Sequence, residues 1–192
     1  MQFDEVHHIF GNSICRRSFL KAGALALGCS LFPQTISGAV IPPQLPERTL
    51  SFYNLHTDES LKVTYWYHGE YITDALSEID FIMRDFRTNE IKTIDSRLIE
   101  LLHTLRNNME SQEKLHIISG YRSPTTNTKL HKKSGGVAAH SLHMQGKAAD
   151  IRLPGKSLES LWKTAKDLKL GGVGYYPSPD FIHVDIGRVR TW

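Results

Sequence analysis

Cysteine is almost absent from this chain, and neither sign of charge dominates it. The 192 residues include two cysteines, Cys15 and Cys29. The chain after residue 29 can therefore form no disulfide and offers no thiol nucleophile. The formal net charge is +3, and it falls to +2 when the first 39 residues are left out. A charge so close to neutral argues against nucleic-acid binding as the main function.

Long apolar runs and serine-hydrolase motifs are also missing. The moderately apolar stretch at residues 22–32 is shorter than the ~20 residues needed to span a bilayer. No G-x-S-x-G sequence is present, and that motif marks the nucleophile of many serine hydrolases. Together with the missing cysteine, this argues against a secreted serine or cysteine hydrolase.

The N-terminus has the features of an export signal. Residues 15–21 read C-R-R-S-F-L-K, the apolar stretch follows, and the small residues Ser37 and Ala39 resemble a cleavage site. We predict that residues 1–39 are a signal of the twin-arginine type, used by the export machinery to reach the periplasm. Cys15 stands where serine or threonine is usual, which leaves the general secretory route open. Cys29, in A-L-G-C, leaves open a lipid anchor.

The rest of the chain is predicted to be a short linker and one domain. Residues 40–47 are rich in proline and form the linker, and residues 48–192 are long enough to bury a core of their own. β-branched and aromatic residues predict a hairpin, helical periodicity predicts two helices that Thr73 and Asp95 cap, and Ser157 can cap a third. Further strands are expected at 115–119, 148–151, 173–176 and 181–186. This order favours an α+β fold with an antiparallel sheet.

Three residues of metal-ligand type occur in two short motifs. His143 and Asp150 lie seven residues apart in S-L-H-M-Q-G-K-A-A-D (141–150), and His183 lies in F-I-H-V-D (181–185). A catalytic zinc takes three protein ligands, usually imidazole nitrogens and carboxylate oxygens, and keeps a fourth position open. Two histidines and one aspartate fit that requirement, although the same ligand types also bind other divalent ions.

These motifs occur with others, and together they resemble a known family. The others are N-L-H-T (54–57), I-S-G-Y-R-S (118–123), G-G-V-G-Y-Y-P (171–177) and the continuation to F-I-H-V-D-I-G (181–187). The chain resembles the zinc DD-peptidase group that shares its fold with the hedgehog signalling domain, and within it the murein endopeptidase K type. The resemblance implies an α+β fold with helices packed on one side of the sheet. It also implies one Zn²⁺ per chain, held by His143, Asp150 and His183.

Further site residues are expected around the metal. A metallopeptidase needs a donor for the carbonyl oxyanion and a proton carrier. The resemblance assigns the donor and substrate-contact role to Arg122. Ser123 and Ser141 are candidates for hydrogen bonds to the substrate or to the residues that hold the metal. Two acids lie near His183 in the sequence. Asp180 is the preferred base, and Asp185, on the same strand face as His183, could orient it or act as the base itself.

The sequence therefore predicts an exported, monomeric zinc peptidase that hydrolyses the peptide cross-links of peptidoglycan. Two alternatives stay open. One is a DD-carboxypeptidase, which would differ in whether the substrate groove is open at both ends. The other is a wall-binding module that keeps the zinc and has lost turnover.

Overall fold

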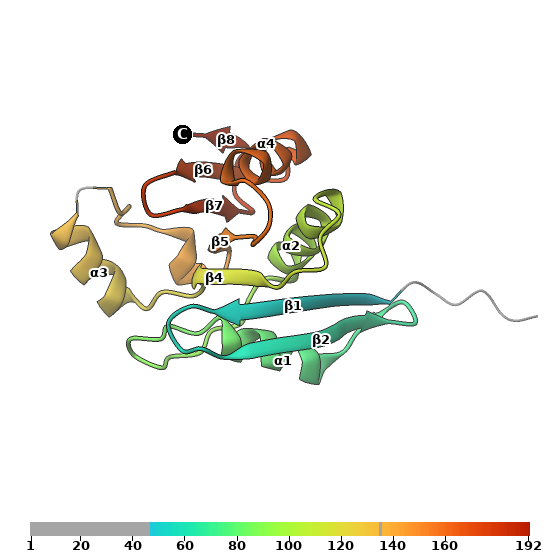
Figure 1. Ribbon diagram of the computed structural model, residues 1–192. Coiled ribbons are helices and arrows are strands. Elements are labelled where there is room, and N and C mark those ends of the chain that lie inside the picture. Colours follow the sequence, from blue (N-terminus) through green and yellow to red (C-terminus); the bar gives the residue numbers. More distant parts are fainter. Residues whose placement is uncertain (1–46, 135) are drawn as a thin grey trace, which may run out of the picture. The chain divides into compact units, whose positions relative to one another are not determined.

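The computed structural model describes residues 47–134 and 136–192 (Figure 1). The predicted export signal and all but the last residue of the predicted linker lie outside the described residues. The strands are β1 (Arg48–Asn54), β2 (Ser60–Tyr67), β3 (Glu70–Tyr71), β4 (Leu115–Ser119), β5 (Ala148–Arg152), β6 (Gly172–Tyr176), β7 (Phe181–Asp185) and β8 (Arg190–Thr191). The helices are α1 (Thr73–Ile82), α2 (Ser96–Asn108), α3 (Pro124–Lys133) and α4 (Leu158–Leu168), with a short 3₁₀ helix, η1 (Leu142–Gln145).

All eight strands form one sheet in the order β3-β2-β1-β4-β5-β7-β6-β8. The α+β class is confirmed, but the expectation of a purely antiparallel sheet is wrong. β1 pairs with β4 in parallel, and β6 pairs with β8 in parallel. The chain between β1 and β4 contains β2, β3, α1 and α2, which makes the connection long enough for a parallel crossover.

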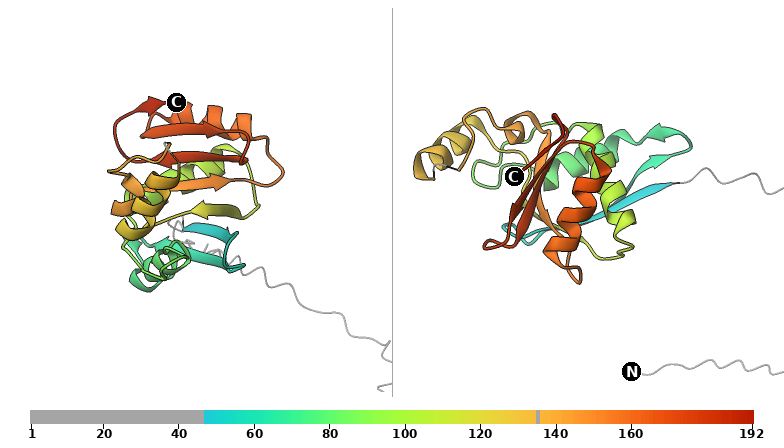
Figure 2. Two further views of the ribbon diagram at one scale, coloured as in Figure 1. Left: turned by 90° about the vertical axis from the view of Figure 1, so that its left-hand side faces the viewer. Right: turned by 90° about the horizontal axis from the view of Figure 1, so that it is seen from above.

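The hydrophobic core lies on one face of this sheet. Alternate residues of β5 and β7 enter it, namely Ala149 and Ile151, and Ile182 and Val184, and all four are fully buried. Buried side chains of α1, α2 and α4 belong to the same cluster. Figure 2 shows α2 and α4 on one side of the sheet and α3 on the other. The expectation that the helices pack on one side therefore fails for α3.

Local sequence explains where the helices begin. Asp95 caps α2 by accepting from the Arg97 N–H at 3.0 Å, and Ser157 caps α4, as predicted. Thr73 is the first residue of α1 and not its cap, so that prediction is wrong. Helix α3 was not predicted, although Ser123 caps it and proline follows at its first position. Among the described residues, no helix combines the length and apolar character needed to cross a membrane.

Candidate metal centre

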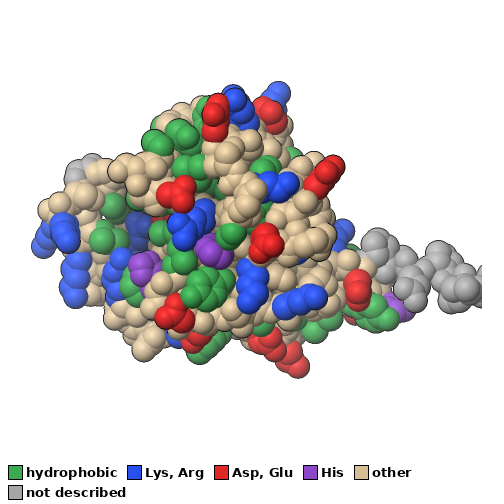
Figure 3. Space-filling view, in the orientation of Figure 1, with side chains coloured by type: hydrophobic (Ala, Val, Ile, Leu, Met, Phe, Trp, Pro, Cys, Tyr) green, Lys and Arg blue, Asp and Glu red, His purple; other side chains and the backbone are tan. Residues whose placement is uncertain are grey.

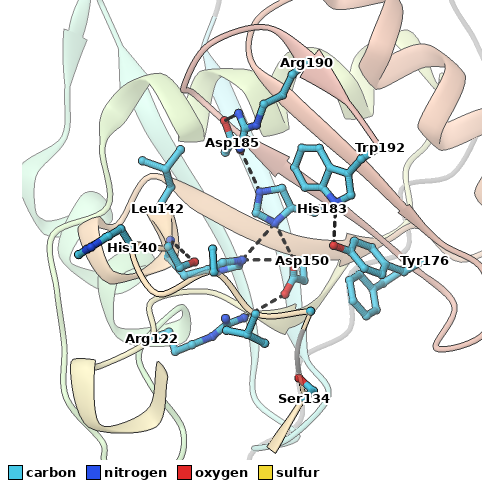
Figure 4. Close-up of a pocket in the computed structure, with 16 residues that line it drawn as sticks. Arg122, Ser134, His140, Leu142, Asp150, Tyr176, His183, Asp185, Arg190 and Trp192 are labelled. Atoms are coloured by element: carbon cyan, nitrogen blue, oxygen red, sulfur yellow. Dashed lines mark hydrogen bonds and ion pairs between the residues drawn. The ribbon is translucent and has the colours of Figure 1, made fainter. Parts of the chain in front are cut away.

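Two neighbouring strands bring Asp150 and His183 together. β5 and β7 are antiparallel, and their register places Asp150 opposite His183. Because side chains alternate along a strand, both residues project from the face opposite the hydrophobic core. The third residue, His143, comes from η1, which is capped by Ser141 and ends at Gly146 in a left-handed conformation with φ 66°. That tight turn places the His143 ring beside the two strand residues (Figure 4).

The three candidate ligand atoms form a compact triangle. His143 Nε2 lies 3.2 Å from Asp150 Oδ1 and 3.2 Å from His183 Nδ1, and His183 Nδ1 lies 2.9 Å from Asp150 Oδ1. A tetrahedral zinc site with bonds of 2.0–2.1 Å has ligand-to-ligand edges of about 3.4 Å. The observed edges are slightly shorter than that. The three residues therefore fit one metal ion with little rearrangement.

The hydrogen bonds behind each imidazole assign its free nitrogen. His143 Nδ1 lies 2.8 Å from the Gly120 carbonyl, which can only accept, so Nδ1 carries the proton. His183 Nε2 lies 3.0 Å from Asp185 Oδ2 and donates to it in the same way. The lone pairs of His143 Nε2 and His183 Nδ1 then converge with the Asp150 carboxylate on one point. Partners of this kind behind a metal-binding imidazole fix its tautomer and its orientation.

Asp185 is the most completely bound carboxylate at this centre. It is fully buried, and besides His183 it binds Arg190, whose Nη2 lies 2.7 Å from Oδ2. The backbone N–H groups of Gly172 and Gly187 donate to Oδ1 at 3.0 and 2.8 Å. Burial alone would raise the pKa of Asp185, but these partners outweigh it and lower the pKa. Asp185 thus lies where the sequence predicted a residue that orients His183. Both of its carboxylate oxygens accept hydrogen bonds from His183, Arg190 and the backbone.

The charges of the cluster are strongly coupled. Burial opposes ionisation of Asp150, yet the adjacent imidazoles of His143 and His183 lower its pKa well below the ordinary value. Burial also lowers the pKa of His183, but the protonated ring can donate from Nδ1 to Asp150 as well as from Nε2 to Asp185, and these two hydrogen bonds raise the pKa. A metal ion between the ligands would take the place of the Nδ1 proton. A buried carboxylate facing two imidazoles is an environment that favours a positive charge at the point between them.

Comparison with known proteins places this centre in a family. Residues 44–192 match the family model described as peptidoglycan L,D-endopeptidase MepK. The peptidoglycan L,D-endopeptidase MepK of Escherichia coli (strain K12) is 38% identical over 177 residues, which cover 92% of this chain and 96% of that protein. The probable peptidoglycan L,D-endopeptidase MepK of Haemophilus influenzae is 38% identical over 178 residues, covering 92% and 95%.

The chain belongs to this peptidase family. Membership implies a catalytic metal, and the ligand-type cluster of His143, Asp150 and His183 is where the structure can hold one. The predicted resemblance to murein endopeptidases of the zinc DD-peptidase superfamily is thereby confirmed.

Arg122 lines the cavity of the metal centre, and its side chain is held in place by burial and by polar neighbours. Its side chain is largely buried, and Nη2 lies 3.4 Å from Asp150 Oδ2 while Nη1 lies 3.4 Å from Asn127 Oδ1. Burial lowers the pKa of Arg122, and the nearby carboxylate of Asp150 opposes that effect. The guanidinium lines the same cavity as the candidate ligands (Figure 4). Its position is compatible with the predicted donor role.

The two serines have structural roles. Ser123 is fully buried, its hydroxyl accepts from the Thr126 N–H at 3.2 Å, and its own N–H donates to Asp85 at 2.9 Å. It caps α3 and does not line the cavity, so the geometry does not support the substrate contact predicted for Ser123. Ser141 does line the cavity, and its hydroxyl accepts from the His143 N–H at 3.3 Å. It helps to position the ligand histidine.

Asp180 is not brought to the metal centre. It stands in the β6–β7 turn with φ 55°, and its carboxylate pairs with Arg152 Nη1 at 3.1 Å. It does not line the cavity that holds His143, Asp150 and His183, and it faces a separate one. The geometry therefore does not support the preference for Asp180 as the base, which stays a prediction. The turn directs the carboxylate towards β5 and away from the ligands.

An aromatic wall on the cavity was not predicted. The cavity measures about 500 Å³. Trp192 stands 5.3 Å from the His183 ring and donates from Nε1 to the Tyr176 hydroxyl at 2.8 Å, and Tyr176 stacks on Phe181 at 4.7 Å. A Cβ at Gly174 would lie 2.7 Å from the Trp192 ring, which explains the glycine there. Only the full fold reveals this wall, because the pairing of β6 with β7 and with β8 brings the three aromatic residues together.

Figure 3 shows the mouth of the cavity as a hollow between the body of the domain and the segment that carries α3, with histidine visible inside it. The segment after α3 supplies the wall opposite the aromatic residues, including Ser134 and His140. The cavity that the ligand-type residues line is therefore open to solvent on this face.

Proposed function

We propose that the protein is a zinc-dependent endopeptidase that cleaves peptide cross-links of peptidoglycan. The observation that carries the proposal is the convergence of His143 Nε2, Asp150 Oδ1 and His183 Nδ1 on one point at the base of an open cavity. The names of the related proteins support peptidoglycan as the substrate and a bond between L and D centres as the one cleaved.

One zinc ion held by these three atoms would supply a Lewis acid that polarises the scissile carbonyl and lowers the pKa of a water molecule. The protein's own residues set that chemistry up. Asp185 and the Gly120 carbonyl fix the two imidazoles. The Arg122 guanidinium, beside Asp150, adds a positive charge near the carbonyl oxygen.

The names of the related proteins support an endopeptidase over a carboxypeptidase. A cross-link continues on both sides of the bond that is cut, so its enzyme needs space for the chain in both directions. The cavity here is open to solvent between the aromatic wall and the segment around His140. Cleavage restricted to a terminal residue, or binding without cleavage, would be recognised in the same assay described below.

We further propose that the protein acts in the periplasm, as a monomer, after export directed by residues 1–39. Peptidoglycan lies outside the cytoplasmic membrane, so a domain that cleaves it must be exported. The arginine pair and the following apolar stretch support that route.

The test is digestion of purified peptidoglycan by the zinc-loaded protein, with fragments identified by mass spectrometry. We expect cross-linked dimers to disappear and monomers to accumulate, with no change for His183→Ala or in the presence of a chelator. Release of single terminal residues with intact dimers would instead indicate a carboxypeptidase. Intact dimers, no released residue and one zinc per chain would indicate a binding module.

A further inference from the structure

A second cavity adjoins the metal centre on the same face of the sheet. It measures about 260 Å³, and Arg152, Lys156, His116 and Asp180 are among its lining residues. Arg152 is two residues after Asp150 on β5, so it projects from the same face about 6.7 Å further along the strand. The peptide neighbours Phe181 and Asp180 line the first and the second cavity respectively. The start of β7 therefore lies between the two cavities.

The charges at this second cavity favour an anion. Two cations, Arg152 and Lys156, face one carboxylate, that of Asp180. Arg152 Nε lies 3.4 Å from His116 Nδ1 and donates to it, which requires that nitrogen to be unprotonated. Burial, and then the positive charge of Arg152, lower the pKa of His116, which favours the neutral ring that accepts from Arg152.

The pair between Arg152 and Asp180 is exposed and easily exchanged. The two side chains are 37% and 60% exposed, and a single contact of 3.1 Å joins them. Exposed pairs of this kind contribute ~0–1 kcal/mol. A carboxylate that arrives with a bound peptide can replace Asp180, because the planar guanidinium can bind it through two parallel N–H groups.

We propose that Arg152, assisted by Lys156, forms a subsite that binds a carboxylate of the substrate peptide on one side of the scissile bond. This proposal rests on the proposed function, since it takes the peptide that occupies the metal centre to continue past Phe181 into the second cavity. The stem peptides of a cross-link carry free carboxylates at chain ends and on diamino acid side chains, so the chemistry of the substrate matches the charge of the cavity. The subsite would select acidic over amidated peptides.

The experiment compares two substrates and three variants of the zinc-loaded protein. The substrates are a purified cross-linked muropeptide dimer and the same dimer with its carboxylates amidated. The variants are Arg152→Gln, Arg152→Lys and the control Arg48→Gln. Arg48 makes a similar surface pair with Glu100, is 36% exposed and lines none of the described cavities. Both kcat and KM are measured, together with the Kd for each dimer.

For Arg152→Gln we expect KM for the acidic dimer to rise about tenfold, since a charge-assisted hydrogen bond is lost, with kcat changed less than about twofold. Arg152→Lys should recover part of the loss, and the amidated dimer should show no difference between variants. Equal effects on both dimers, or no effect on either, would overturn the subsite. The Kd values do not depend on turnover, so they test the subsite even if the wild-type protein cleaves neither dimer, which would count against the proposed function alone.

Discussion

The two faces of the central sheet are built from the same strands and serve opposite purposes. On β5 and β7, Ala149, Ile151, Ile182 and Val184 enter the hydrophobic core. Between them, Asp150 and His183 project to the other face and meet His143 from η1. The core face gains stability from apolar area removed from water. The site face holds charged groups out of water, which is unfavourable unless each one is paired.

The polar groups of the site face each need a specific hydrogen-bond partner, whereas the side chains of the core face need only to fill the available volume. Every polar atom of Asp185 is matched, by His183, Arg190 and two backbone N–H groups. Close approach of β6 is part of this arrangement, since a Cβ at Gly172 would lie 2.6 Å from Asp185 Oδ2. Substitutions on the two faces should therefore differ in kind as well as in size.

The largest expected effect is on the site face. His183→Ala removes a metal ligand and the partner of both Asp150 and Asp185, so we expect bound zinc to be lost and cross-link cleavage to fall at least about 1,000-fold. Metal analysis and a muropeptide assay measure the two losses. The circular dichroism spectrum should stay that of the folded protein, because the core face is untouched. Cleavage that persists with zinc still bound would contradict the ligand assignment.

A substitution on the core face should act on stability instead. Ile151 is fully buried and lies next to Asp150 in sequence. Ile151→Ala leaves a cavity, and we expect the free energy of unfolding to fall by about 2–5 kcal/mol. Denaturant titration of the metal-free protein measures this. At a temperature where the variant is folded, it should still bind one zinc, and failure to do so would show that the two faces are not separable.

A smaller effect is expected from the residue behind His183. Asp185→Asn keeps the shape of the side chain and removes its charge, so we expect zinc affinity to fall about 10- to 100-fold. Competition with a chromogenic chelator measures the affinity. Asp180→Asn is the matched control, because Asp180 faces the second cavity, and its zinc affinity should equal that of the wild type. Equal losses in both variants would point to a general charge effect.

The smallest effect on turnover is expected at Asp180 itself. Loss of a general base lowers kcat by about 100- to 10,000-fold. Since Asp180 pairs with Arg152 and not with the metal centre, Asp180→Asn should change kcat less than about threefold. The KM for acidic peptides should fall, because Arg152 is released. A kcat reduced 100-fold would restore Asp180 as the base.

The sequence was most informative where a local motif carries the structure. The run from Ser141 to Asp150 contains two ligand-type residues and the strand that carries Asp150, and both features were predicted without the fold. The short helix η1 and its cap at Ser141 were not predicted. The β1–β2 hairpin and the caps of α2 and α4 could be predicted for the same reason, because each depends on residues a few positions apart.

The sequence was least informative where the outcome depends on distant partners. Asp180 lies three residues before His183, yet Arg152 draws its carboxylate to the second cavity. Ser123 lies in a motif near the site, yet it caps α3. The parallel pairing of β1 with β4 joins segments that are far apart in the chain. Trp192 is near His183 in sequence, but it reaches the His183 ring only through the pairing of β8 with β6. No pattern within one segment reports such contacts.

Anomalous diffraction at the zinc absorption edge, from crystals of the zinc-loaded protein, tests the central claim most directly. We expect one zinc ion per chain, bonded at about 2.0–2.2 Å to His143 Nε2, Asp150 Oδ1 and His183 Nδ1, with a fourth position open to the cavity. Zinc bound through other residues, or no zinc at this point in the zinc-loaded protein, would contradict the account.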